Sequence, residues 1–137
     1  MKPTLLILGG DQRNRIVLDI LRERGFSVEY FSDTRRENTQ AILQHISQTE
    51  YQLLPMMLAE QPICGIDRAE LLEACPAHSH LFCGAATQHW IKDCQDKGHC
   101  LVQLLQNETL AAENAYYTAE GAIGLVQELS KASMYQA

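Results

Sequence analysis

The sequence contains no apolar stretch that approaches the roughly 20 residues a helix needs to cross a bilayer. It has no excess of positive charge either, because 17 acidic residues outnumber 11 Lys and Arg and give a net charge of −6. An acidic chain repels the phosphate backbone of nucleic acids. The first residues, up to Thr4, carry no signal-peptide pattern. We therefore expect a cytoplasmic protein whose partners include neither nucleic acid nor a membrane.

Paired cysteines are absent as well. The five cysteines are an odd number and no two form a Cys-x-x-Cys pair, so reduced and mostly buried thiols are expected. His78 and His80, with Cys83 and His99-Cys100 nearby, could be combined into a thiol–imidazole metal site. No paired ligand spacing supports such a site, so hydrogen-bonded strand histidines are the preferred interpretation and no metal is expected. Cys83 is expected to be a structural thiol and not a nucleophile.

The length is sufficient for one domain. The chain has 137 residues, 46% of them hydrophobic and 20% charged, as is typical of a soluble globular protein. Residues 1–36 hold seven cations and five acids, whereas the remainder holds four cations and twelve acids. We interpret this asymmetry as two differently solvated faces. No linker or low-complexity segment interrupts the sequence, so residues 1–137 are predicted to form a single domain.

Short apolar segments alternate with amphipathic segments about every 22–26 residues. The run Thr4–Leu8 is apolar without alternation, which predicts a parallel strand covered on both faces. Further strands are predicted at residues 26–31, 51–57, 78–83 and 99–105. Helices are predicted at residues 12–24, 35–48, 67–75, 87–97, 107–114 and 118–131. Short connections of this kind require parallel strands with right-handed crossovers. The predicted fold class is α/β: a three-layer sandwich with a flavodoxin-like five-stranded parallel sheet in the order 2-1-3-4-5.

Individual residues refine these elements. Asp11 and Asp67 are placed to cap the helices that follow them. Pro55 lacks an N–H group, so the third strand must end or bulge there. Glycines end two helices, at Gly25 and Gly98. The side chains expected on the inward faces of the first two helices are Ile16, Val17, Ile20, Leu21, Ala41, Ile42 and Ile46.

Ligands of such a sheet gather at the carboxyl ends of the strands, near the switch point of the strand order. The candidate segments there are residues 9–13, 55–56 and 83–85 and the region around Asn114. Gly9-Gly10 allows a close approach of backbone to a ligand, and the following helix N-terminus favours an anion, although a plain tight turn explains the pair equally well. It is not a dinucleotide fingerprint, since no third glycine follows before Gly25, and no Gly-Lys-[Ser/Thr] phosphate loop occurs.

Two relatives of this fold class are excluded by specific positions. A receiver domain needs an aspartate at the end of the third strand and a lysine after the fifth. The sequence has Leu54-Pro55-Met56 at the first place and Gln106-Asn107 at the second. A flavodoxin needs a loop rich in Ser, Thr and Gly after the first strand, which Asp11 and the following arginines do not supply.

The last of these candidate segments, around Asn114, covers residues 114–123. Thr118 is a good N-cap and Glu120 lies in the first turn, where the helix dipole favours an acid. Gly121 inside a helix costs about 1 kcal/mol relative to Ala. Either a close helix contact or a ligand beside the backbone would compensate for that cost, and both interpretations remain open.

Three blocks of residues occur in one order along the chain. They are Gly9-Gly10-Asp11-x-Arg13, Pro76-Ala77-His78 leading to Phe82-Cys83-Gly84, and Asn114-x-x-x-Thr118-Ala119-Glu120-Gly121-Ala122-Ile123. Together they resemble the N-terminal domain of the A-type chain of dipicolinate synthase over nearly the whole chain, and the last block is the most specific.

The resemblance implies a flavodoxin-like domain that, in the complete family enzyme, is followed by a Rossmann domain. It implies an NADP-dependent oxidoreductase that oxidises a dihydrodipicolinate-type intermediate to dipicolinate, the calcium chelator of spores. It thus links the chain to sporulation and implies a partner, the flavoprotein-like B-type chain of dipicolinate synthase.

This sequence departs from the family in two places. Tyr116-Tyr117 stand where the family usually carries Ile-Pro, and the chain stops at Ala137, about where the Rossmann domain should begin. Hydride transfer requires both partners within about 3–3.5 Å of each other. We therefore expect that this chain alone binds no cofactor and does not complete the reaction, and whether it is an enzyme by itself stays open.

The first hypothesis is a substrate-domain homologue that binds a small dicarboxylate. Backbone N–H groups of Gly10 and Asp11, with Arg13, would hold one carboxylate, and the segment from Asn114 would line the interdomain side. The predicted substrate-binding residues are Gly9, Gly10, Asp11, Arg13, Cys83, Gly84, Asn114, Thr118, Glu120 and Gly121.

The second hypothesis is a non-catalytic binding or assembly module. Its C-terminal helix would present an apolar stripe of Ala119, Ala122, Ile123, Val126 and Leu129, through which we expect a homodimer. A third interpretation is that the chain is part of a longer enzyme, or that a separate Rossmann protein completes it.

Overall fold

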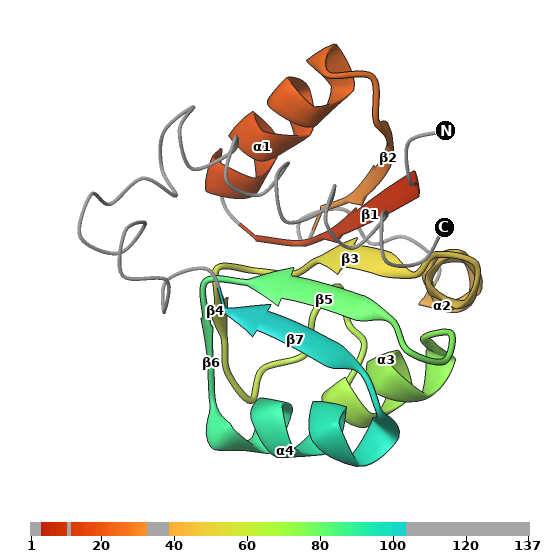
Figure 1. Ribbon diagram of the computed structural model, residues 1–137, viewed down its shortest axis with the longest axis vertical. Helices are drawn as coiled ribbons and strands as arrows, with labels where there is room; N and C mark the ends of the chain where they lie inside the picture. Colours follow the sequence, from red (N-terminus) through yellow and green to blue (C-terminus); the bar gives the residue numbers. More distant parts are fainter. Residues whose placement is uncertain (1–3, 11, 33–38, 104–137) are drawn as a thin grey trace.

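The computed structural model describes residues 4–10, 12–32 and 39–103. Five parallel strands form its central sheet (Figure 1). They are β1 (Thr4–Leu8), β2 (Ser27–Phe31), β3 (Tyr51–Leu53), β5 (His80–Cys83) and β7 (Cys100–Gln103). Their order is β2-β1-β3-β5-β7, which in chain order is 2-1-3-4-5 and confirms the predicted topology.

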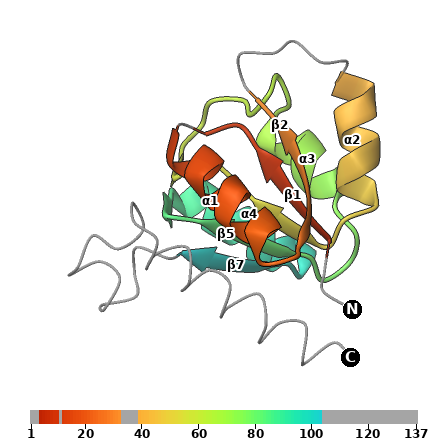
Figure 2. The ribbon, with the colours of Figure 1, turned by 90° about the horizontal axis from the view of Figure 1, so that it is seen from above.

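Helices cover both faces of this sheet. They are α1 (Gln12–Glu23), α2 (Thr39–Ser47), α3 (Arg68–Ala74) and α4 (Gln88–Lys97). Figures 1 and 2 show α1 on one face and α3 and α4 on the opposite face. Isoleucines of α2 pack in the same core cluster as α3 and α4, so α2 also belongs to that second layer. The result is the predicted three-layer α/β sandwich.

Strand β1 shows how the sequence selects this architecture. Leu5 and Ile7 belong to the core under α1, whereas Leu6 and Leu8 belong to the core under the other three helices. All four side chains are fully buried or nearly so. An apolar run without alternation is the pattern that a strand covered on both faces requires.

The third predicted strand breaks where proline removes a donor. β3 ends at Leu53, and the chain continues as β4 (Met57–Leu58), which pairs with β6 (Ala85–Ala86) in a separate two-stranded parallel sheet. The carbonyl oxygen of Met56 accepts from the N–H groups of Gly84 (2.8 Å) and Ala85 (2.9 Å). The break expected at Pro55 is confirmed, and the pairing after it continues beyond the main sheet.

Several boundaries and faces differ from the sequence prediction. The fourth strand begins at His80 and not at residue 78, because His78 has a φ of 60° and lies in the preceding turn. His78 and His80 therefore do not share a strand face. On α1, Ile16 is 39% exposed and Leu18 is only 5% exposed, so the buried face is rotated from the expected one. Ala41 of α2 is exposed as well.

Other differences concern caps and the loop after β4. Asp67 is the N-cap residue of α3, but its side chain makes no capping hydrogen bond. The loop at residues 59–66 contains an antiparallel bridge between Ile63 and Ile66, and both side chains are buried. Gly98 ends α4 in the left-handed conformation, with a φ of 77°, as predicted. The helices predicted at residues 107–114 and 118–131 lie outside the described residues.

Candidate functional site

A tight turn between β1 and α1 lies at the carboxyl end of the sheet. Gly9 and Gly10 have φ angles of 62° and 87°, in the region that side chains disfavour. The Gly9 N–H donates to the Phe31 carbonyl oxygen at 2.7 Å, which fixes the turn to the end of β2. A Cβ added to Gly10 would lie 2.3 Å from Nδ2 of Asn14. Both the backbone conformation and the lack of space therefore require glycine at residue 10.

Asn14, in the first turn of α1, is the polar residue that organises this turn. Its side chain is fully buried, and Nδ2 donates to the carbonyl oxygens of Leu54 (3.1 Å) and Gly9 (3.4 Å). Oδ1 is buried and has no hydrogen-bond partner among the described residues. Asn14 therefore joins the exit of β1 to the exit of β3, which are the two strands flanking the switch point.

Sequence reasoning missed Asn14, although the sequence carries a signal for it. Asn14 stands three, four and seven residues before Val17, Leu18 and Leu21, which are the buried side chains of α1. That spacing places it on the inward face of the helix. A polar residue on an apolar helix face needs buried hydrogen-bond partners.

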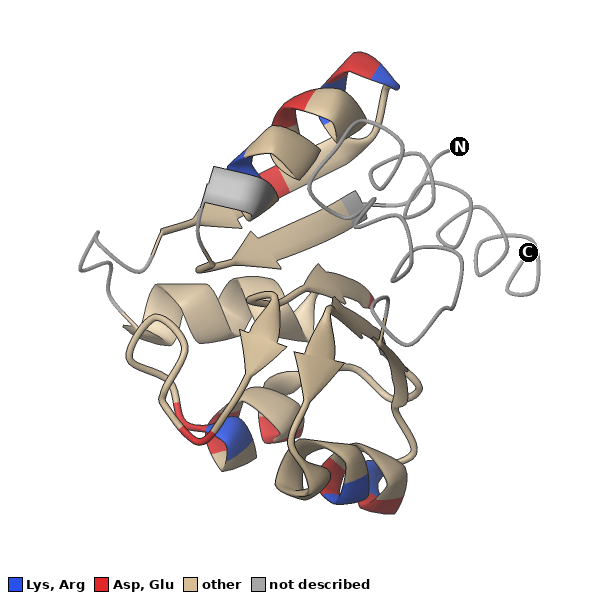
Figure 3. Ribbon diagram, turned by 90° about the vertical axis from the view of Figure 1, so that its left-hand side faces the viewer, with Lys and Arg blue, Asp and Glu red and all other residues tan. Residues whose placement is uncertain are grey.

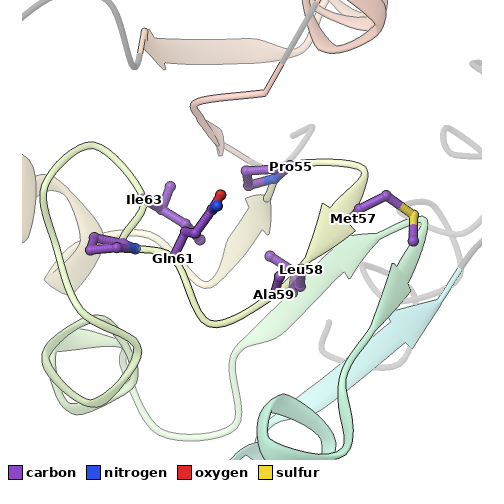
Figure 4. A pocket seen from close by; sticks show the side chains of 7 residues that line it. Pro55, Met57, Leu58, Ala59, Gln61 and Ile63 are labelled. Atoms are coloured by element: carbon purple, nitrogen blue, oxygen red, sulfur yellow. The ribbon is translucent and has the colours of Figure 1, made fainter.

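Beside this turn lies a hollow of about 120 Å³ between the end of β3 and the loop after β4 (Figure 4). Figure 4 shows the Gln61 amide extending across the hollow toward Pro55, with Leu58 and Ala59 on another side. The residues that line it are Pro55, Met57, Leu58, Ala59, Gln61, Pro62 and Ile63. Pro55 directly follows Leu54, the acceptor of the Asn14 amide, so the hollow adjoins the glycine turn.

The loop that forms one wall of the hollow is held by side chains of α3 and α4. Glu60 pairs with Arg68 of α3, and its other carboxylate oxygen lies 2.6 Å from Nδ1 of His89 in α4. Hydrogen bonds from His89 and then Arg68 lower the pKa of Glu60. Trp90 Nε1 donates to the Ala59 carbonyl oxygen at 2.7 Å. The wall is therefore attached to both helices before any ligand arrives.

Asp93 of α4 is the second carboxylate partner of Arg68 in this network. It accepts from Nε of Arg68 at 2.7 Å, and hydrogen bonding to Asp93 is the main reason that the pKa of Arg68 is raised. Arg68 thereby has two carboxylate partners on two different segments. These ion pairs are largely exposed, so their role is to position the loop and not to add much stability.

Charged side chains are absent from the strand ends themselves. Within the described part of the chain, residues 4–10, 53–59 and 82–87 contain no Lys, Arg, Asp or Glu. Figure 3 looks onto this side and shows charge on α1 and near α3 and α4, with uncharged strands between them. Binding of a charged ligand at this edge would therefore depend on the N-terminus of α1 and on residues that flank the strands.

The structure describes five of the ten predicted site residues. Gly9 and Gly10 form the turn above, and the backbone of Arg13 lies in the first turn of α1. Cys83 and Gly84 lie at the end of β5 and are both buried. The Gly84 N–H donates to Met56, so this pair adjoins the segment Leu54–Met56. Asp11, Asn114, Thr118, Glu120 and Gly121 lie outside the described residues, as does the apolar stripe expected to form a dimer.

The cysteines are structural where the structure places them in the core. Burial raises the pKa of Cys83 and Cys75 to about 12 and that of Cys94 to about 11. A thiol with such a pKa is almost entirely protonated near neutral pH, so none of the three is an activated nucleophile. The expectation of mostly buried thiols is confirmed for Cys75, Cys83 and Cys94, whereas Cys64 is half-buried and Cys100 is exposed.

The histidines make ordinary structural contacts. Nδ1 of the buried His99 accepts from the Ser79 N–H at 3.2 Å, and Nε2 lies 3.3 Å from the Leu72 carbonyl oxygen. His80 stacks on Tyr51 with ring centroids 5.4 Å apart. Among the residues with described positions, no group of three His, Cys, Asp or Glu is arranged to hold a metal ion. Of the helices in the same part of the chain, none is long and apolar enough to cross a membrane.

Parallel strands with helices on both faces and a switch point between β1 and β3 define the class of flavodoxin-like α/β domains. Comparison with solved structures gives a particular similarity: the A chain of dipicolinate synthase from Bacillus subtilis, with a TM-score of 0.64 and 18% identity. The match covers 93% of this chain and 48% of that one, so this chain spans about half the length of its structural neighbour. At this identity the likeness is one of fold.

A second solved structure is similar at a lower score. It is a response regulator receiver domain protein (CheY-like) from Methanospirillum hungatei JF-1, with a TM-score of 0.48 and 16% identity over 96% of this chain and 98% of that one. No protein-family model matches the sequence, and no curated protein matches it either.

Proposed function

We propose that this chain is a dicarboxylate-binding domain related to the first half of the A-type chain of dipicolinate synthase. The observation that carries the proposal is the fold shared with the dipicolinate synthase A chain over 93% of this chain. The order of the three sequence blocks, from the Gly9-Gly10 turn through Phe82-Cys83-Gly84 to the Asn114 segment, supports the same relationship.

The geometry of the β1–α1 turn supports binding of an anion there. The N-terminus of α1 follows directly after the turn, and helix N–H groups and the helix dipole favour negative charge. Gly9 and Gly10 add no side chains of their own beside this helix end, although Asn14 packs against one side of Gly10, and this favours a close approach of a carboxylate. Arg13 in the first helical turn would then add a charge-assisted hydrogen bond. The acidic net charge does not oppose this, because screening limits exposed charges to about 8 Å.

We further propose that this part of the chain does not hold a dinucleotide by itself. The turn lacks the third glycine that lets a helix pack closely on its strand, and the adjoining hollow of about 120 Å³ is too small for one. We therefore propose that any hydride-transfer chemistry would depend on NADP held by a further domain or by a separate protein. The link to sporulation and to the flavoprotein-like partner is part of the same proposal.

Calorimetric titration with pyridine-2,6-dicarboxylate tests the proposal. We expect saturable binding, and we expect Arg13→Gln to weaken it by about tenfold, the effect of losing one hydrogen bond to a charged group. Arg15→Gln is the matched control, since it removes the same charge from the same helix two residues further on. Absence of binding at millimolar ligand, or equal weakening by both variants, would refute a carboxylate site at this turn.

A further inference from the structure

We propose that the hollow beside Pro55 is a separate binding site for one small, uncharged aromatic ring that carries an amide-like polar group. This inference does not rest on the proposed dicarboxylate site, because the hollow is lined by different residues. None of the seven residues that line it is Gly9, Gly10 or Arg13.

The size of the hollow limits the ligand to a single ring. An engineered apolar cavity of about 150 Å³ holds one benzene molecule. The hollow measures about 120 Å³ and its rim includes the exposed residues Ala59, Gln61 and Pro62, so it opens to solvent. The hollow is smaller than that cavity, so it admits at most one six-membered ring, and a substituent must extend toward the opening.

The chemistry of the lining disfavours a charged ligand. Pro55, Leu58 and Ile63 are apolar members of the lining, which also exposes polar groups, and none of the seven lining residues is charged. The nearest carboxylate in sequence, Glu60, is not among them and is occupied by Arg68 and His89. A charge placed in the hollow would lose hydration without gaining an ionic partner among the described residues, which is costly.

The lining favours a flat ring with a neutral polar group. Proline rings are surfaces on which aromatic rings pack, as proline-rich segments do in aromatic-lined grooves. Gln61 extends its amide across the hollow toward Pro55 (Figure 4), where it can donate and accept one hydrogen bond each. A carboxamide on the ring can form both of these hydrogen bonds with the Gln61 amide.

The walls are held in place without a ligand, which lowers the entropic cost of binding. Trp90 fixes the Ala59 carbonyl oxygen, Glu60 is held by α3 and α4, and Ile63 is bridged to Ile66. The other side of the hollow is fixed by the Asn14 bond to Leu54, next to Pro55. The hollow is therefore built from both sides of the break between β3 and β4.

Amide NMR titration with benzamide tests this inference. We expect saturable shifts concentrated at residues 57–63, with a dissociation constant on the order of 1 mM for a ligand of this size. Cyclohexanecarboxamide tests the need for a flat ring and benzoate tests the need for neutrality, and each is expected to bind at least about fivefold more weakly. Pyridine-2,6-dicarboxylate is expected to shift residues of the glycine turn and not this set.

Point variants distinguish binding in the hollow from binding elsewhere on the surface. Ala59→Leu fills it and should abolish the shifts, whereas Ala69→Leu makes the same change at an exposed residue of α3 and should leave them unchanged. Gln61→Leu keeps the volume and should weaken benzamide about fivefold through the lost hydrogen bonds. Scattered non-saturating shifts, benzoate binding as strong as benzamide, or equal effects of both alanine variants would overturn the inference, whatever the dicarboxylate titration gives.

Discussion

The side-chain amide of Asn14 donates a hydrogen bond to the carbonyl oxygen of Leu54, 40 residues further along the chain, at 3.1 Å. The same nitrogen lies 3.4 Å from the Gly9 carbonyl oxygen. One buried side chain thus satisfies two carbonyl groups at the ends of neighbouring strands, where the ladder between β1 and β3 has stopped. Both candidate sites border this connection, so its loss should disturb both.

Replacing Asn14 should lower stability. Asn14→Leu keeps most of the volume but leaves two buried carbonyl oxygens without their donor, so we expect a loss of about 1–3 kcal/mol in urea unfolding. Exposed Gln48→Leu in the turn after α2 serves as the control and should change little. An unchanged midpoint for Asn14→Leu would contradict the structural role given to this amide.

Asn14→Asp should give a variant whose stability depends on pH. A buried carboxylate facing two carbonyl oxygens meets no donor among the described residues, as Oδ1 of Asn14 shows, so its pKa in the folded state should exceed that of the unfolded chain. Stability should then rise as pH falls, because the protonated carboxyl can donate to Leu54. Urea unfolding across mildly acidic pH measures this, and a pH profile parallel to that of the parent chain would contradict it.

Gly10→Ala should be more damaging than the same change at Gly65. Both glycines have positive φ, 87° and 79°, so both substitutions incur backbone strain of about 1 kcal/mol. The added Cβ at Gly10 would clash with the buried Asn14 side chain at 2.3 Å, whereas at Gly65 the nearest atom is Thr39 Cγ2 at 3.6 Å. Thermal unfolding should give Gly10→Ala a clearly lower melting temperature than Gly65→Ala. Equal melting temperatures would show that the turn changes its conformation to accommodate the added Cβ.

His80 should make the protein less stable in mild acid. Desolvation at its place in β5 lowers its pKa despite the opposing charge of Glu50. The unfolded chain therefore takes up a proton first, and stability should fall as pH drops below about 6.5, the ordinary histidine pKa. His80→Gln should flatten that part of the profile, whereas exposed His78→Gln should not. Identical slopes for the two variants would contradict this assignment.

Thiol reactivity should separate the cysteines by burial. Cys100 is exposed, whereas Cys75 and Cys83 are buried with a pKa of about 12. Alkylation of the folded chain followed by peptide mass spectrometry should modify Cys100 first, with Cys83 protected until urea is added. Cys100→Ser should remove the fast phase. Modification of Cys83 at the rate of Cys100 would mean that the end of β5 opens in solution.

The order of the sheet was predictable because its signals are local. Apolar runs such as Thr4–Leu8, glycines at helix ends such as Gly98, and short connections leave few topologies for a parallel sheet. The break at Pro55 was predictable for the same reason, since the residue itself lacks the donor. The resemblance in three blocks, including Phe82-Cys83-Gly84, also led to the neighbour whose fold this chain shares.

The candidate sites were less accessible because they depend on contacts between distant segments. Sequence alone did not give the rotation of α1 that buries Leu18 and exposes Ile16, since both are apolar. It did not give the second small sheet of β4 and β6, because two-residue strands have no periodicity to detect. Nor did it identify Glu60 as the residue that attaches its loop to two helices.

By itself, then, the sequence determined the class of fold, the chain order of the strands and the break at Pro55, because backbone chemistry and hydrophobic pattern act over a few residues. The tertiary structure decided which polar groups meet at the carboxyl edge. The hydrogen bonds from Asn14 to Leu54 and from Trp90 to Ala59 form only after β1, β3 and α4 are packed. Buried hydrogen bonds of this kind form between segments that the core has already brought together, so they are fixed by packing and not by local sequence.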